Sequence, residues 1–211
     1  MKLVVLGANG RTGRHVVREA LVRGATVTAI VRSDAKRSRI EHDRLGEIVG
    51  DPCDPQFLAT VFRGQDAVIS TLGGRRPTKK ATSIYHMSAN AIARAAQDAG
   101  LKKVVVTSSA LLFPRRRLLD KVLVSIVPNV VQSATRMEQT LEASDLDVVI
   151  ARCGFLTDSR ETRYRGEPGS LPDRGSSVSR LSLAMFLVDT VQKSWSGHQV
   201  YGVSGPSDHE R

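Results

Sequence analysis

The chain opens with Met1-Lys-Leu-Val-Val-Leu-Gly-Ala-Asn-Gly-Arg-Thr-Gly13, and this stretch decides the fold. An apolar run ending at Leu6 is typical of a buried strand, and three glycines spaced three apart lead into a helical pattern from about Arg11 to Arg23. In mononucleotide-binding folds such glycines allow a sharp turn, a close approach of backbone N–H groups to a pyrophosphate, and close helix packing. The helix dipole then favours the anion. Glycine triplets also occur in turns that bind nothing, so this predicted phosphate-binding loop depends on the rest of the chain.

Length and composition limit the class of protein. The 211 residues, with 41% apolar and 25% charged side chains, are typical of one globular domain. No apolar run is long enough to span a membrane and the chain starts directly with a strand, so we expect a soluble, cytoplasmic protein. The formal charge of +10 leaves nucleic acid, a membrane surface or an anionic small molecule open as partners.

Neither a metal site nor a disulfide is expected. Cys53 and Cys153 lie far apart without metal-ligand spacing, and no two histidines have such spacing. The sequence therefore predicts two reduced thiols.

Strand and helix patterns alternate along the chain, which predicts an α/β fold of the Rossmann type, with a doubly wound parallel sheet in a single domain over residues 1–211. Further strands are expected at 25–31, 46–49, 66–70, 102–107, 146–151 and 199–203. Helices are expected from the N-cap Asp54 to Phe62, at 82–99, at 128–143 and after the N-cap Ser179. Residues 157–177 are rich in Gly, Pro, Ser and charge, and we expect them to form an irregular segment over the substrate side.

The end of the second strand indicates which dinucleotide binds. In dinucleotide folds an acidic residue there accepts hydrogen bonds from the ribose 2′-OH, whereas an arginine accommodates a 2′-phosphate. This chain has Arg32 at that position and Lys36 one turn later, which favours NADP(H) over NAD. A solvated basic loop is the alternative, and it is the role we expect for Arg37 and Arg39.

Other strand ends add candidate positions along the same edge. Asp51 would flank the adenine, and Gly73 would pass close to the cofactor with no side chain in the way. The fifth strand ends in hydroxyl residues, and Ser109 is placed to donate a hydrogen bond to a substrate carbonyl or a flavin ring nitrogen. The alternative is that one of these hydroxyls caps the strand end.

These motifs together resemble the atypical short-chain dehydrogenases, in the NmrA-like NAD(P)H-binding branch that contains the NADPH-dependent flavin reductase, also called biliverdin reductase B. The resemblance rests on residues 7–13, 31–32, 50–51, 64–69, 72–73 and 107–110, and on Gly197-His198. It implies a single-domain NADP-binding fold and a reductase of flavins, bilins or quinones, with Ser109 facing the substrate. The implied cofactor residues are Gly7, Asn9, Gly10, Arg11, Thr12, Gly13, Arg32, Lys36, Asp51, Pro52, Leu72, Gly73, Arg75, Thr107, Ser108 and Cys153.

The chain departs from that family at two places. Gly154 stands where the mammalian flavin reductase has an active-site histidine, and Cys153 stands where a proline is usual. The Tyr-x-x-x-Lys pair of typical short-chain dehydrogenases is also missing, because Ala89 follows Tyr85 at that spacing. We therefore do not expect alcohol oxidation by a tyrosine acid/base. Some NmrA-like relatives bind the dinucleotide without turnover, so a redox sensor is the alternative to a reductase.

Basic residues follow the fourth and fifth strands and would lie at the ligand-binding edge. They are Arg75, Arg76, Lys79, Lys80, Arg115, Arg116 and Arg117. Such a rim would attract an anionic acceptor, such as a flavin phosphate or a dicarboxylated tetrapyrrole, although charge runs are also common on solvated surfaces. No nucleic-acid recognition motif is present. We expect a small-molecule acceptor as the partner, no membrane, and a monomer or weak homodimer.

Overall fold

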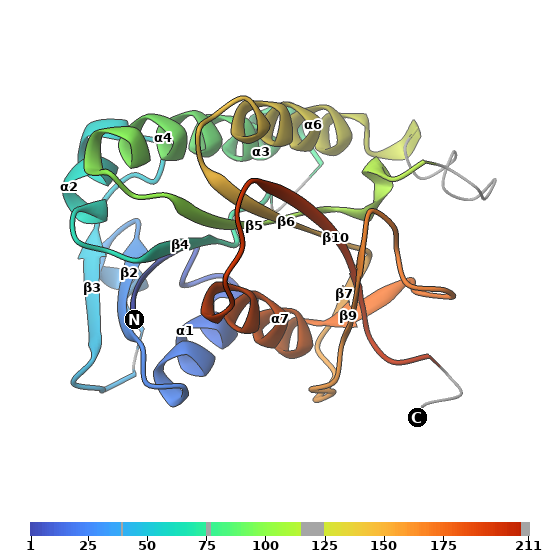
Figure 1. Ribbon diagram of the computed structural model, residues 1–211, viewed down its shortest axis with the longest axis horizontal. Helices are drawn as coiled ribbons and strands as arrows, with labels where there is room; N and C mark the ends of the chain where they lie inside the picture. Colours follow the sequence, from blue (N-terminus) through green and yellow to red (C-terminus); the bar gives the residue numbers. More distant parts are fainter. Residues whose placement is uncertain (39, 75–76, 115–124, 208–211) are drawn as a thin grey trace.

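An eight-stranded sheet forms the centre of the computed structural model, which describes residues 1–38, 40–74, 77–114 and 125–207 (Figure 1). The strand order is β3-β2-β1-β4-β5-β6-β10-β8, and only β8 is antiparallel to its neighbour. The strands are β1 (Lys2–Leu6), β2 (Thr26–Val31), β3 (Leu45–Val49), β4 (Ala67–Ser70), β5 (Lys103–Ser109), β6 (Asp147–Cys153), β8 (Arg165–Pro168) and β10 (His198–Ser204). The order reverses between β1 and β4, which is where open α/β sheets bind ligands at the carboxyl ends of their strands. The predicted Rossmann-type fold is confirmed.

Helices cover both faces of the sheet. One face carries α1 (Gly13–Val22) and α7 (Arg180–Gln192), and the other carries α2 (Pro55–Phe62), α4 (Ile84–Ala99) and α6 (Pro128–Glu142) (Figure 1). The short helices are α3 (Lys79–Thr82), η1 (Asp34–Lys36) and η2 (Ala110–Leu112). No helix in the described ranges is long and apolar enough to cross a membrane.

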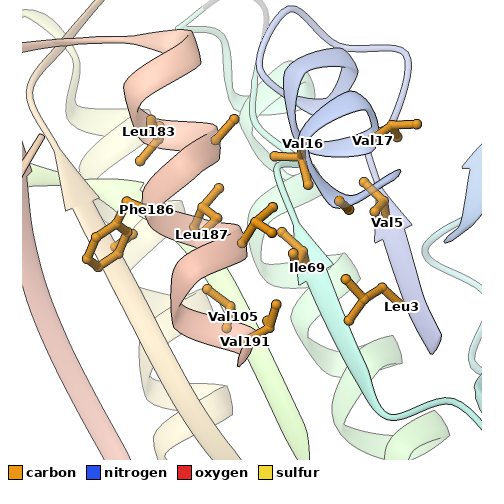
Figure 2. Close-up of a cluster of buried hydrophobic side chains, with 14 of the residues drawn as sticks. Leu3, Val5, Val16, Val17, Ile69, Val105, Leu183, Phe186, Leu187 and Val191 are labelled. Atoms are coloured by element: carbon orange, nitrogen blue, oxygen red, sulfur yellow. The ribbon is translucent and has the colours of Figure 1, made fainter. Parts of the chain in front are cut away.

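The alternation of side chains along the strands divides the core into two clusters. In β1, Leu3 and Val5 point to the α1/α7 face, whereas Val4 and Leu6 point to the α2/α4/α6 face. Figure 2 shows the first cluster, in which side chains of α1 and α7 face those of β1, β4 and β5. Burial on both faces explains why these strands read as nearly continuous apolar runs.

Several predicted helix boundaries are confirmed. The Asp54 carboxylate accepts hydrogen bonds from the Gln56 and Phe57 N–H groups at 2.9 and 3.2 Å, and the Ser179 hydroxyl accepts from the Ser182 N–H at 2.8 Å. The first helix begins at Gly13 and not at Arg11, because the preceding residues form the turn that leaves β1.

The expectation of an irregular segment at 157–177 is wrong for part of its length. β8 lies inside it and pairs with β10, and β7 (Phe155–Thr157) pairs in parallel with β9 (Ser177–Ser179) in a small second sheet. β8 lacks an apolar alternation because it is an edge strand with largely exposed side chains. Its close packing comes from a glycine, since a Cβ on Gly166 would lie 2.9 Å from the Phe186 ring.

Candidate active site

The loop between β1 and α1 has the geometry of an anion site. Gly7 has φ +77°, and a Cβ on Gly13 would lie 2.1 Å from the Gly7 carbonyl oxygen, so both positions require glycine. The Gly10 N–H donates to the Gly7 carbonyl at 2.8 Å and closes the turn. The N–H groups of Arg11, Thr12 and Gly13 donate to no group in the described part of the chain. Free N–H groups at a helix N-terminus are the arrangement that binds a phosphate.

Polar side chains of the same loop are partly engaged within the protein. The Asn9 side-chain oxygen accepts from the Arg14 Nε and Nη2 atoms at 3.0 and 2.5 Å, so it braces the loop against α1. The Arg11 guanidinium forms an ion pair with Asp158. Thr12 is buried at the N-cap of α1 and makes no side-chain capping bond.

Two cationic side chains follow the end of β2. Arg32 and Lys36 are exposed, and neither forms an ion pair or side-chain hydrogen bond with any described residue. Arg37 differs, because its Nε donates to Asp34 at 2.8 Å and its Nη1 donates to the Glu47 carbonyl at 2.5 Å. Arg37 therefore braces its own loop, while Arg32 and Lys36 are free to bind a 2′-phosphate. Arg39 lies outside the described residues.

The ends of β3 and β4 lie along the same edge. Asp51 is exposed and accepts from the Cys53 N–H at 2.9 Å, while Pro52 is buried beside it. After β4, Leu72 packs on the α2/α4/α6 cluster, and a Cβ on Gly73 would lie 3.0 Å from the Tyr85 hydroxyl. The backbone after β4 can therefore pass close to the Tyr85 hydroxyl because residue 73 has no side chain. Arg75, Arg76 and residues 115–117 lie outside the described residues.

The three hydroxyls at the end of β5 have different surroundings. The Thr107 hydroxyl donates to the Ser70 carbonyl at 3.5 Å. Ser108 is buried and donates to Glu138 Oε1 at 2.5 Å, so its side chain points toward α6. The Ser109 oxygen accepts from the Leu111 N–H at 3.3 Å, which is the capping role weighed as the alternative. That bond uses a lone pair and leaves the Ser109 O–H free to donate.

Sequence reasoning missed a buried ion pair behind Ser108. Arg152 Nη2 lies 2.5 Å from Glu138 Oε2, its Nη1 donates to the Leu112 carbonyl at 3.2 Å, and its guanidinium stacks 4.8 Å from the Phe113 ring centroid. The side chains are 16% and 4% exposed, respectively. A pocket of about 610 Å³ opens beside this pair, between residues 111–114 and α6. The sequence did offer a signal for this pair, because Glu138 falls on the buried side of α6 and Arg152 falls within the apolar strand β6.

The last residue of β6 is Cys153, which carries a thiol. Cys153 is 8% exposed, its thiol donates to the Ser108 carbonyl at 3.3 Å, and burial raises its pKa to about 12. A cofactor contact for Cys153 stays a prediction. At the next residue, a Cβ on Gly154 would lie 2.1 Å from the Ser176 carbonyl oxygen. Any side chain at this position would therefore require the Ser176 backbone to move.

Tyr85 is a second polar group that sequence reasoning did not assign to the site. It lies in the first turn of α4, and its hydroxyl forms no hydrogen bond with any residue in the described ranges. Burial, together with the nearby Cys153, raises its pKa to about 12, so the phenol stays protonated and can only donate or accept a neutral hydrogen bond. No cluster of metal ligands occurs among the described residues.

Comparison with known proteins identifies the family. Residues 7–194 match the family model described as NAD(P)H-binding. The chain belongs to this NAD(P)H-binding family. The match begins at the first glycine of the phosphate loop and includes the strand ends described above. The family match thus supports NAD(P)H as the cofactor of this chain.

Curated proteins similar to this family member include photosystem II assembly factors named Ycf39. The one from Cyanophora paradoxa is 30% identical over 160 residues, which are 74% of this chain and 46% of that protein. The one from Synechocystis is 31% identical over 123 residues, covering 57% of this chain and 38% of that protein. The chain thus spans less than half the length of these relatives.

Solved structures show the same NAD(P)H-binding fold. A short-chain dehydrogenase/reductase from Veillonella parvula, solved in complex with NADP, has a TM-score of 0.83 at 21% identity, covering 99% of this chain and 96% of that chain. ChuY, an anaerobillin reductase from Escherichia coli O157:H7, has a TM-score of 0.77 at 21% identity and covers 98% of each chain. At such identities the likeness concerns the fold.

Proposed function

We propose that the protein is an NADPH-dependent reductase that passes hydride to a planar acceptor of the flavin, quinone or bilin type. The observation that carries the proposal is the placement of two unengaged hydroxyl protons, on Ser109 and Tyr85, along the strand edge that begins with the phosphate loop. A cytoplasmic location and a monomeric or weakly dimeric state belong to the same proposal. The two free cysteines support the location, because a reducing compartment keeps thiols reduced.

The chain's own residues would act mainly by positioning. Arg32 and Lys36, which have no ion-pair partner among the described residues, would bind the 2′-phosphate, and this favours NADPH over NADH. When bound, the cofactor supplies the hydride. Ser109 would donate a hydrogen bond to the acceptor atom that gains electron density, and Tyr85 would remain a neutral donor beside Gly73. The proton that completes the reduction would come from solvent.

Turnover measurements test this proposal. NADPH consumption is followed with flavin mononucleotide, quinones and biliverdin as acceptors, and NADH is compared with NADPH at equal concentration. We expect measurable turnover with at least one acceptor and a preference for NADPH. Tight NADPH binding without turnover on any acceptor would reject the reductase assignment.

A second candidate is an NADP(H)-binding partner of other proteins that has no turnover of its own. It is favoured by the similarity to the Ycf39 assembly factors over 74% of this chain. The missing Tyr-x-x-x-Lys pair and the glycine at 154 also fit a protein that binds the cofactor without chemistry. The turnover panel separates the two candidates.

A further inference from the structure

One carboxylate bridges two arginines at the entrance to the phosphate loop. Asp158 lies just after β7, and its Oδ1 accepts from Arg180 Nη1 at 2.7 Å. Its Oδ2 pairs with Arg11 Nη2. Each carboxylate oxygen therefore serves one guanidinium, so the two guanidinium groups face a common point. A phosphate presents oxygens to two arginines in the same manner.

The two arginines differ in how firmly the protein holds them. Arg180 is the first residue of α7, and its side chain is only 13% exposed. It lies on the helix that packs against α1, and its Nη1 is held by Asp158 Oδ1 at 2.7 Å. Arg11 is 67% exposed and Asp158 is 57% exposed. Arg180 is thus a fixed cation, whereas the pair above it can rearrange.

The surroundings of this carboxylate carry an excess of positive charge. α1 and α7 pack against each other and both begin at the carboxyl edge of the sheet, so their positive dipole ends point the same way (Figure 1). The N–H groups of Arg11, Thr12 and Gly13 are also free of partners in the described ranges. A single Asp158 charge faces two guanidinium groups and these donors. The site can therefore accept a ligand with more than one negative charge.

We propose that Arg180 is the second arginine of the cofactor's diphosphate site and that Asp158 occupies the place of the diphosphate oxygens until the dinucleotide displaces it. The proposal rests on cofactor binding at loop 7–13. The Arg11–Asp158 pair is exposed, and exposed pairs contribute little to stability, so its opening costs little. The diphosphate then binds Arg11, Arg180 and the free N–H groups together. Asp158 sets the affinity by competing with the cofactor.

Equilibrium titration of NADPH, followed by fluorescence, tests this for Asp158→Asn and Arg180→Gln. Removing the competing carboxylate should tighten NADPH binding by about 3- to 10-fold, and removing the buried guanidinium should weaken it by about 10-fold or more. Asp173→Asn and Arg160→Gln are matched controls, because both residues lie on exposed loop positions and neither contacts Asp158. Both controls should bind NADPH like the wild type.

A probe without a diphosphate locates the effect. Adenosine 2′-monophosphate carries only the phosphate assigned to Arg32 and Lys36, so its affinity should stay the same in both variants. In the Arg11→Gln background the gain from Asp158→Asn should shrink, because the two residues act as a pair. If Arg180→Gln fails to fold, the Asp158→Asn titration and this double-mutant cycle decide the matter.

Two different failures can be told apart. If the wild type binds neither NADPH nor adenosine 2′-monophosphate, the cofactor site at loop 7–13 is refuted. If the wild type binds NADPH and Asp158→Asn binds it no more tightly than Asp173→Asn does, the competition by Asp158 is refuted while the cofactor site stands. An equal change in affinity for both ligands would also refute it, since the effect would then be a general charge effect.

Discussion

Gly13 offers a direct test of the phosphate loop, because its packing gives a magnitude. In Gly13→Ala the new Cβ would lie 2.1 Å from the Gly7 carbonyl oxygen, 2.8 Å from the Gly7 carbonyl carbon and 2.9 Å from Ala8 Cα. All three are backbone atoms, so the loop and the first turn of α1 must separate by about 1 Å, and overpacking of this kind costs about 1–3 kcal/mol. Lower chain entropy in the unfolded state returns about 0.4–1 kcal/mol. The expected net loss is about 1–2 kcal/mol.

Two measurements follow the change. Thermal denaturation by circular dichroism should show a lower Tm, at about 2–4 °C for each kcal/mol in a chain of this size. NADPH titration should show a larger effect, because displaced N–H groups lose charge-assisted hydrogen bonds worth about 1.5–3 kcal/mol each, or about 10- to 100-fold in Kd. Gly46→Ala is the control, since a Cβ there has its nearest neighbour at 4.0 Å. If both variants melt and bind alike, the assignment of the loop is wrong.

Four further predictions concern residues of the site and of the buried ion pair beside it. Arg32→Glu should reverse the preference for NADPH over NADH, measured as the ratio of the two Kd values, and an unchanged ratio would contradict the 2′-phosphate site. Ser109→Ala should lower kcat by about 10-fold or more with little change in the Kd for NADPH, because the lost hydroxyl would bond to the substrate and not to the cofactor. An unchanged kcat would mean that the Ser109 hydroxyl only caps the strand end. Glu138→Gln should lower the free energy of unfolding, measured with urea, by about 3–5 kcal/mol, because the buried Arg152 charge loses its partner. A loss below about 1 kcal/mol would mean that Arg152 finds other partners. The free energy of unfolding should fall as pH rises above 9, because the unfolded Cys153 thiol ionises near 9.0 and the buried one near 12, and Cys153→Ala should reduce this slope.

Features with local signals were predictable from the sequence. The phosphate loop was recognisable because its three glycines follow an apolar strand and precede a helix, and the structure shows a steric reason for two of them. The N-caps Asp54 and Ser179 were recognisable because their side chains bond to N–H groups only two or three residues away. Such contacts depend on neighbouring residues and not on the rest of the fold.

Features that depend on distant segments were not predictable in this way. β8 forms because β10 offers a partner more than thirty residues later, and its own four residues show no strand pattern. Asp158 meets Arg11 and Arg180 from three separate segments, so no local spacing indicated the contact. Ser108 is an intermediate case, since it shares its side of β5 with Val104 and Val106 and its direction toward α6 followed from that alternation.

The strand β8 also limits how copies of this protein can associate. It forms the outer edge beyond β10, and its four residues include Arg165, Glu167 and Pro168. Proline has no N–H to donate, and charged side chains at an edge oppose the approach of another strand. Extension of the sheet across this edge into a second molecule is therefore disfavoured. Self-association by strand pairing would have to use the opposite edge, β3, where Ile48 and Val49 are exposed, so variants in β3 are the place to look for altered self-association.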